Sequence, residues 1–85
     1  MATQATIATF TAAEPLDGDF PYVDITFGTA YASASVYAAV VGVEFSDGYG
    51  PIEVWIKESS VTASGLRLLA ADQFAGTVTV ITVDV

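Results

Sequence analysis

The 85-residue sequence contains no cysteine and no histidine. Without cysteine, no disulfide can cross-link the fold and no thiolate can act as a nucleophile. Without histidine, the chain lacks the usual base of a nucleophilic triad and the imidazole ligand of structural zinc sites. We therefore expect a protein that is not an enzyme and that holds no metal ion or cofactor.

Positive charge is also scarce, since Lys57 and Arg67 face ten carboxylates and the formal net charge is −8. Binding to nucleic acid depends on clustered Lys and Arg side chains, and two isolated cations make no such patch. The same shortage disfavours an anionic membrane surface. We expect neither nucleic acid nor a membrane among the partners.

Long hydrophobic runs are absent as well. The longest nearly apolar stretch, Ala34 to Val43, falls short of the roughly 18 residues that a transmembrane helix needs. No cationic segment precedes an apolar stretch at the amino terminus, as it would in a secretory signal peptide. These features predict synthesis in the cytoplasm without a secretory signal.

The length fits one hydrophobic core, so residues 1–85 are expected to form a single domain. A core this small is marginal without a disulfide or a metal ion, and oligomerisation is the remaining common means of support. Hydrophobic residues make up 53% and charged residues 14% of the chain, against about 25% charged residues in ordinary domains. This surplus of apolar residues predicts subunit contacts, in a trimer or a larger ring.

Alternation of apolar and polar residues predicts β-strands along most of the chain. The expected strands cover residues 6–10, 22–27, 35–45, 51–57, 66–70 and 77–85. Within the fourth, Val54 and Ile56 are expected to point inward and Trp55 outward, while Gly42 is a candidate bulge in the third. Both faces of the last strand carry β-branched residues, so we predict a central strand that is covered on both sides. Thr82 is assigned to the face opposite Val78.

Residues 64–76 also fit a short helix capped by Ser64 and ended by Gly76. We prefer a strand over 66–70 followed by a turn over 72–76. Six strands joined by short connections predict an all-β fold, a small antiparallel six-stranded β-sandwich. Its edge strands would be protected by neighbouring subunits.

Two groups of carboxylates are candidate sites, one catalytic and one for calcium. Glu44, Asp47, Glu53 and Glu58 are formal candidates for a glycosidase pair, but solvated carboxylates that keep strands soluble are the favoured interpretation. The loop over 14–19 holds three carboxylates around a glycine, which suits calcium in chemistry but does not match the spacing of an EF-hand. We interpret it as an acidic turn.

Aromatic side chains are the remaining candidates, because Tyr and Trp anchor protein interfaces and stack on sugars. Trp55 is open to three interpretations: a glycan platform, a subunit or partner contact, or packing within the chain. Contact with a partner is favoured. The predicted interface residues are Trp55, Tyr49, Tyr31 and Tyr37.

From Ile25 onward the chain resembles a module of bacteriophage tail fibres and related virion proteins that is similar to H-type lectin domains. Three segments carry the resemblance: Ile25 to Tyr31 (ITFGTAY) leading into the strand over 36–43, Val54 to Lys57 (VWIK) before Val61 to Leu66 (VTASGL), and Phe74 to Val78 (FAGTV) before the last strand. The resemblance implies a six-stranded antiparallel sandwich that forms a homotrimer or hexamer. The last strand lacks the tryptophan common in that family, and neither a histidine nor a suitably placed arginine is present for a sugar site.

The resemblance implies a structural protein of a bacteriophage virion, most simply an oligomeric capsid decoration (cement) protein. Its partners would be copies of itself and the major capsid protein or other virion proteins. The alternative from another class is a carbohydrate-binding module of a tail fibre that serves host recognition. A small domain with a purely cellular partner is a third interpretation.

Overall fold

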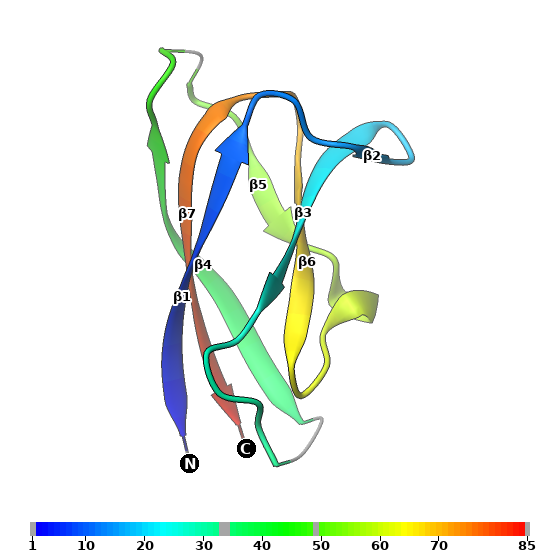
Figure 1. The fold of residues 1–85 in the computed structure, drawn as a ribbon, viewed down its shortest axis with the longest axis vertical. Helices are drawn as coiled ribbons and strands as arrows, with labels where there is room; N and C mark the ends of the chain where they lie inside the picture. The colour runs from blue at the N-terminus through cyan, green and yellow to red at the C-terminus, as the bar shows by residue number, and fades with distance from the viewer. Residues whose placement is uncertain (1, 33–34, 49, 85) are drawn as a thin grey trace.

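The computed structural model describes residues 2–32, 35–48 and 50–84, and these residues form two antiparallel sheets (Figure 1). The strands are β1 (Thr3–Thr11), β2 (Leu16–Asp17), β3 (Phe20–Thr26), β4 (Val36–Phe45), β5 (Val54–Ile56), β6 (Gly65–Ala70) and β7 (Ala75–Asp84), with a 3-10 turn, η1 (Glu58–Ser60), after β5. The predicted all-β class is confirmed. In the described part of the chain, no helix has the length and apolar character needed to cross a bilayer.

The strand count is seven rather than six, because β2 was missed. It forms a two-residue hairpin with β3, in which Leu16 pairs with Pro21 and Asp17 with Phe20. Gly18 stands in the turn with φ +64°, a conformation that glycine adopts without steric cost. The pair is too short to give a visible alternation in the sequence.

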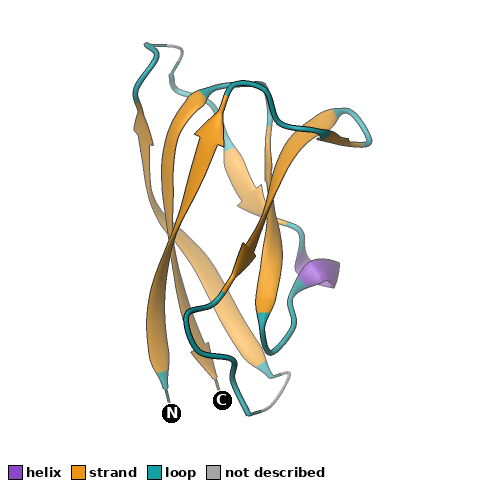
Figure 2. Ribbon diagram, viewed as in Figure 1, coloured by secondary structure: helices purple, strands orange, loops and turns teal. Residues whose placement is uncertain are grey.

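One sheet has the order β1-β7-β4 and the other the order β2-β3-β6-β5. Figure 2 shows the strands of the two sheets side by side, with loops at both ends. Across the interior, β1 lies against β3 and β4 against β5. The inward faces of both sheets build a single core, which is the β-sandwich arrangement.

Three aromatic rings lie at one end of this core. Phe74, at the β6–β7 turn, stacks on Phe10 with ring centroids 4.6 Å apart and meets the edge of Phe45 at 5.2 Å. Each ring comes from or borders a strand of the three-stranded sheet. Stacked and edge-on rings of this kind stabilise a core beyond the apolar area that they bury.

The last two strands resolve the ambiguity at residues 64–76. The helix alternative is wrong there, because β6 and β7 run on either side of a turn and each pairs along its length with neighbouring strands. Gly65 is the first residue of β6 and Gly76 the second residue of β7. A Cβ atom at either would lie 2.3 Å or less from the carbonyl oxygen of Ile25 or Glu44. Close approach of backbones therefore requires glycine at both positions.

Strand β7 is central in its sheet, and its inner face is fully buried. Thr82 belongs to this inner face with Val78 and Val80, so its predicted assignment to the other face is wrong. Its hydroxyl lies 2.8 Å from the Tyr31 hydroxyl, which also donates a hydrogen bond to the Thr82 carbonyl at 3.0 Å. Those bonds supply the partners that a buried threonine needs.

Strand β4 contains the predicted irregularity. Its pairing with β7 is regular from Val36 to Val40 and again from Gly42 to Phe45, and the register shifts between Val40 and Gly42. The bulge at this glycine is confirmed. It divides β4 into two regular halves.

Candidate interaction surfaces

The outer face of the three-stranded sheet carries three large exposed hydrophobic residues, Ile7, Tyr37 and Val41. Alternate residues of its strands point away from the core, as the burial of every second residue indicates. We call this surface the open face; it consists of Thr3, Ala5, Ile7 and Thr9 of β1, Thr77, Thr79, Ile81 and Val83 of β7, and Tyr37, Ala39 and Val41 of β4.

The open face has few charges, although the chain has twelve charged residues. Glu44 pairs with Thr77 and therefore points to the same side of the sheet, at one end of the face. Ile7 and Tyr37 are each 67% exposed, and Val41 is 59% exposed. Exposed apolar surface of this kind is uncommon on monomeric domains, which makes the open face a candidate interaction surface.

The outer face of the four-stranded sheet differs, because both cations of the chain meet there. Arg67 binds Asp24, its partner across the β3–β6 pair, through two hydrogen bonds of 2.7 and 3.0 Å. Asp17 accepts from Arg67 at 3.0 Å and from Lys57 at 2.8 Å. We call these four residues the ionic cluster. The expectation of two isolated cations is wrong, because β2, β3, β5 and β6 bring them together.

The electrostatics of the ionic cluster favour the charged forms of its members. Hydrogen bonds from Lys57 and then Arg67 lower the pKa of Asp17, and the hydrogen bond from Arg67 lowers the pKa of Asp24. Asp24 and then Asp17 raise the pKa of Arg67 further above its usual range. The Arg67 guanidinium also lies over the Tyr22 ring, 3.8 Å from its centroid. This contact adds a cation–π attraction to the ion pairs.

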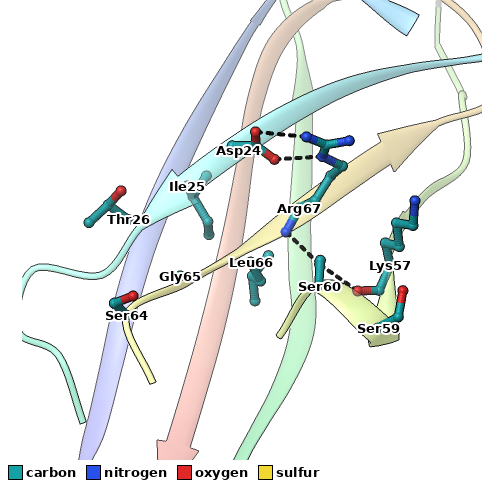
Figure 3. Close-up of a pocket in the computed structure, with 10 residues that line it drawn as sticks. All are labelled: Asp24, Ile25, Thr26, Lys57, Ser59, Ser60, Ser64, Gly65, Leu66 and Arg67. Atoms are coloured by element: carbon teal, nitrogen blue, oxygen red, sulfur yellow. Dashed lines mark hydrogen bonds and ion pairs between the residues drawn. The ribbon is translucent and has the colours of Figure 1, made fainter. Parts of the chain in front are cut away.

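Beside the ionic cluster lies an open pocket of about 420 Å³ (Figure 3). Its other lining residues are mostly hydroxyl-bearing: Thr26, Ser59, Ser60 and Ser64. The Ser60 hydroxyl is already used within the fold, since it donates to the Lys57 carbonyl and accepts from the Arg67 amide at 2.8 Å. The pocket can accept hydrogen bonds from a polar ligand and donate to it, but both of its cations are already neutralised.

Aromatic residues cover the rest of this face. Leu69 points outward from β6, yet it is only 6% exposed, because Trp55 and Tyr22 stand opposite it on the neighbouring strands. Phe20 meets Trp55 edge to face at 5.0 Å. The four-stranded sheet thus has a small apolar cluster on its outer side, covered by its own chain.

The predicted interface residues fall in different places. Tyr37 lies exposed on the open face, and Trp55 points outward as predicted but is half-buried against Phe20. Tyr31 lies in the core at 7% exposure, where its ring meets Phe27 at 5.6 Å. A side chain so buried offers little surface to a partner. Tyr49 lies outside the described residues.

The carboxylates considered above as candidate sites do not form a metal site. Among the described residues, no group of three or more His, Cys, Asp or Glu residues could hold a metal ion. In the loop over 14–19, Asp17 belongs to the ionic cluster, whereas Glu14 accepts from the Thr11 amide and hydroxyl. Among the glycosidase candidates, Asp47 accepts from the Ala75 amide at 2.7 Å and so ties the β4–β5 loop to β7.

A second depression lies at the edge of the sandwich between β4 and β5. It measures about 590 Å³ and is lined mainly by apolar residues: Val36 to Val40 of β4, Val54 to Ile56 of β5, Glu58 and Val61. We call it the β4–β5 groove. Both strands are edge strands of their sheets, so the groove opens where the two sheets end.

Sequence reasoning missed Ile7, Val41 and Ile81 as members of a surface. Alternation within each strand does reveal a second apolar face, but it does not reveal which strands are neighbours. No family model, no curated protein and no solved structure matches this chain. The fold and the surfaces described above are therefore the basis for a functional proposal.

Proposed function

We propose that this chain is a non-enzymatic structural subunit that works as one of several identical copies. The observation that carries the proposal is the open face, which exposes Ile7, Tyr37 and Val41 and has a carboxylate, Glu44, at one end. Because the molecule has a net charge of −8, contact through a face with so few carboxylates limits the repulsion between two copies. Burial of this face would also add the apolar area that a small core without disulfides lacks.

The specific setting that we propose is a bacteriophage virion, with the chain as a homotrimeric or hexameric capsid decoration protein bound to the major capsid protein. Support for the virion comes from the resemblance of the segment beginning at Ile25 to virion modules. Support for decoration comes from the combination of a small sandwich and a broad contact face. A cement protein needs such surfaces and no catalytic group.

Light scattering on the purified protein tests self-association. The wild type is expected to form trimers or hexamers, and Ile7→Glu, which places a charge in the open face, is expected to shift it to monomers. Leu16→Glu is the matched control, because Leu16 is also exposed, at 58%, but stands on β2 of the other sheet. A wild type that stays monomeric at high concentration would overturn the proposal.

Mass spectrometry of purified virions tests the setting. The protein is expected in the virion at a stoichiometry that matches its oligomer, and the purified protein is expected to rebind capsids stripped of it. Its absence from virions would reject the viral setting, while the light-scattering result would still bear on self-association.

A carbohydrate-binding module of a tail fibre is the second candidate. The observation that favours it is the Phe20–Trp55 ring pair on the same sheet face as the hydroxyl-lined pocket, since sugars bind by stacking on rings and by hydrogen bonding. A glycan array distinguishes the two candidates. A tail-fibre module is expected to bind particular glycans, and Trp55→Ala is expected to abolish that binding. A decoration protein is expected to bind capsids and no glycan on the array.

A further inference from the structure

We infer that the β4–β5 groove binds an extended segment of another protein, with alternating aliphatic side chains and Lys or Arg at its ends, and that this segment adds a strand to β4. The inference goes beyond self-association and does not rest on it. It begins from the order of the three-stranded sheet, in which β4 pairs with β7 on one side and has no strand of this chain on the other among the described residues.

The edge of β4 is unusually suited to pairing. Natural edge strands are commonly protected by lysine, proline, short length or a bulge. Strand β4 has ten residues with neither lysine nor proline, and its only charge is Glu44 near the end. The bulge lies after Val40, so the half that lines the groove, Val36 to Val40, keeps a regular register. That half can template a new strand.

The groove beside this edge supplies pockets for side chains. Val36, Ala38 and Val40 are half-buried against the core from one wall, and Val54 and Ile56 from the other. An added strand places every second side chain toward the interior. Its aliphatic residues would fill the groove, with a volume of about 590 Å³, and so complete the edge of the sandwich.

Charge identifies the kind of occupant. Glu58 lines the groove, and Glu44 stands one residue before the end of β4. Both cations of the chain are held in the ionic cluster, where they offset Asp17 and Asp24, and the molecule keeps a formal net charge of −8. A second copy would bring the same excess of negative charge. A segment with cationic ends complements the groove instead.

Three capped peptides probe this inference on the full chain. The first is Lys-Val-Thr-Val-Thr-Val-Lys, the second has glutamate in place of both lysines, and the third is the lysine peptide with alternate backbone nitrogens methylated. By fluorescence anisotropy at low ionic strength, the lysine peptide is expected to bind at least about tenfold more tightly than the glutamate peptide. The methylated peptide is expected not to bind, since it cannot complete the strand hydrogen bonds.

Hydrogen exchange of the wild type then locates the peptide. Added lysine peptide is expected to protect the amides of Val36 to Val40, and Ala38→Phe, which fills the groove, is expected to weaken binding at least about tenfold. Ala13→Phe is the control, because Ala13 is exposed in the β1–β2 connection. The monomeric Ile7→Glu variant should bind the peptide as the wild type does, which separates this inference from self-association.

Four results would overturn the inference: no saturable binding of the lysine peptide, equal binding of the methylated peptide, protection at β1 instead of β4, or protection of β4 that grows with protein concentration in the absence of peptide. The last result would identify a second copy as the occupant. If Ala38→Phe fails to fold, the exchange measurement on the wild type decides alone.

Discussion

The outer face of the β1-β7-β4 sheet carries mainly threonine and aliphatic side chains, with Tyr37 and Glu44 among them. The outer face of the β2-β3-β6-β5 sheet carries two ion-paired cations and a cover of aromatic rings. On the second face, Leu69 is shielded by Trp55 and Tyr22, and Arg67 is held by Asp24. On the first, Ile7 remains 67% exposed.

The difference separates two uses of apolar residues in one small domain. The four-stranded sheet covers its outward apolar residue with its own chain, so this face contributes to the stability of the monomer. The three-stranded sheet leaves comparable residues uncovered, so any stabilisation from them requires a partner. Each prediction below changes one face and uses a matched position as control.

The largest effect is expected from Leu69→Ala. Leu69 is almost fully buried beneath the aromatic cover, and its truncation should cost about 2–4 kcal/mol of unfolding free energy. Ile7→Ala on the open face should cost less than about 1 kcal/mol when measured at a concentration low enough to keep the chain monomeric. Urea unfolding compares the two; equal costs would mean that the open face is also covered within the monomer.

A smaller effect is expected from threonines on the two faces of β7. Thr82→Val removes the hydroxyl partner of Tyr31 and should cost about 1–2 kcal/mol, because a buried polar group loses a hydrogen bond. Thr79→Val on the open face should change the free energy of unfolding by no more than about 0.5 kcal/mol. The double variant Tyr31→Phe/Thr82→Val should recover part of the loss, and a strictly additive result would argue against a coupled pair.

The smallest effect is expected from acid. Since the folded-state pKa values of Asp17 and Asp24 are lowered, their pairing stabilises the fold above the unfolded pKa of about 3.9 and loses that contribution as the pH falls through the folded values. Acid also relieves repulsion among the other carboxylates, so wild type and Asp17→Asn/Asp24→Asn must be compared.

The difference in urea midpoint between these two proteins should shrink between about pH 5 and pH 2. Because the cluster is still partly exposed to solvent, the difference should be modest and should also shrink in high salt. A difference that is independent of pH would mean that the two asparagines act through packing rather than charge.

Most strands were predictable because their alternation is a local property. Residues 22–27 and 35–45 were expected as strands, and β3 and β4 occupy Phe20–Thr26 and Val36–Phe45. Of the strand expected over residues 51–57, only Val54–Ile56 forms β5. Pro51 cannot take part, because it lacks the amide hydrogen that a ladder requires. The face of Thr82 was misassigned, although strict counting from Val78 would have placed it correctly.

The candidate surfaces were less predictable, because they depend on strand neighbours. Asp24 and Arg67 are 43 residues apart in the sequence and become direct partners only in the β3–β6 pair. The sequence pattern indicates that both point outward, but not that they meet. The position of Tyr31 was not predictable either. Tyr31 lies in a loop, yet its ring packs into the core, where its hydroxyl meets the buried Thr82 hydroxyl.

The two ends of the described chain have a mechanical consequence. Strands β1 and β7 run antiparallel, Thr3 pairs with Val83, and the Asp84 amide donates to the Ala2 carbonyl at 3.1 Å, so both ends lie at the same pole (Figure 1). A pulling force applied to them would load the hydrogen bonds of this ladder one pair after another, like a zipper. Under the proposed self-association, contacts across the open face would add to the resistance of the isolated chain.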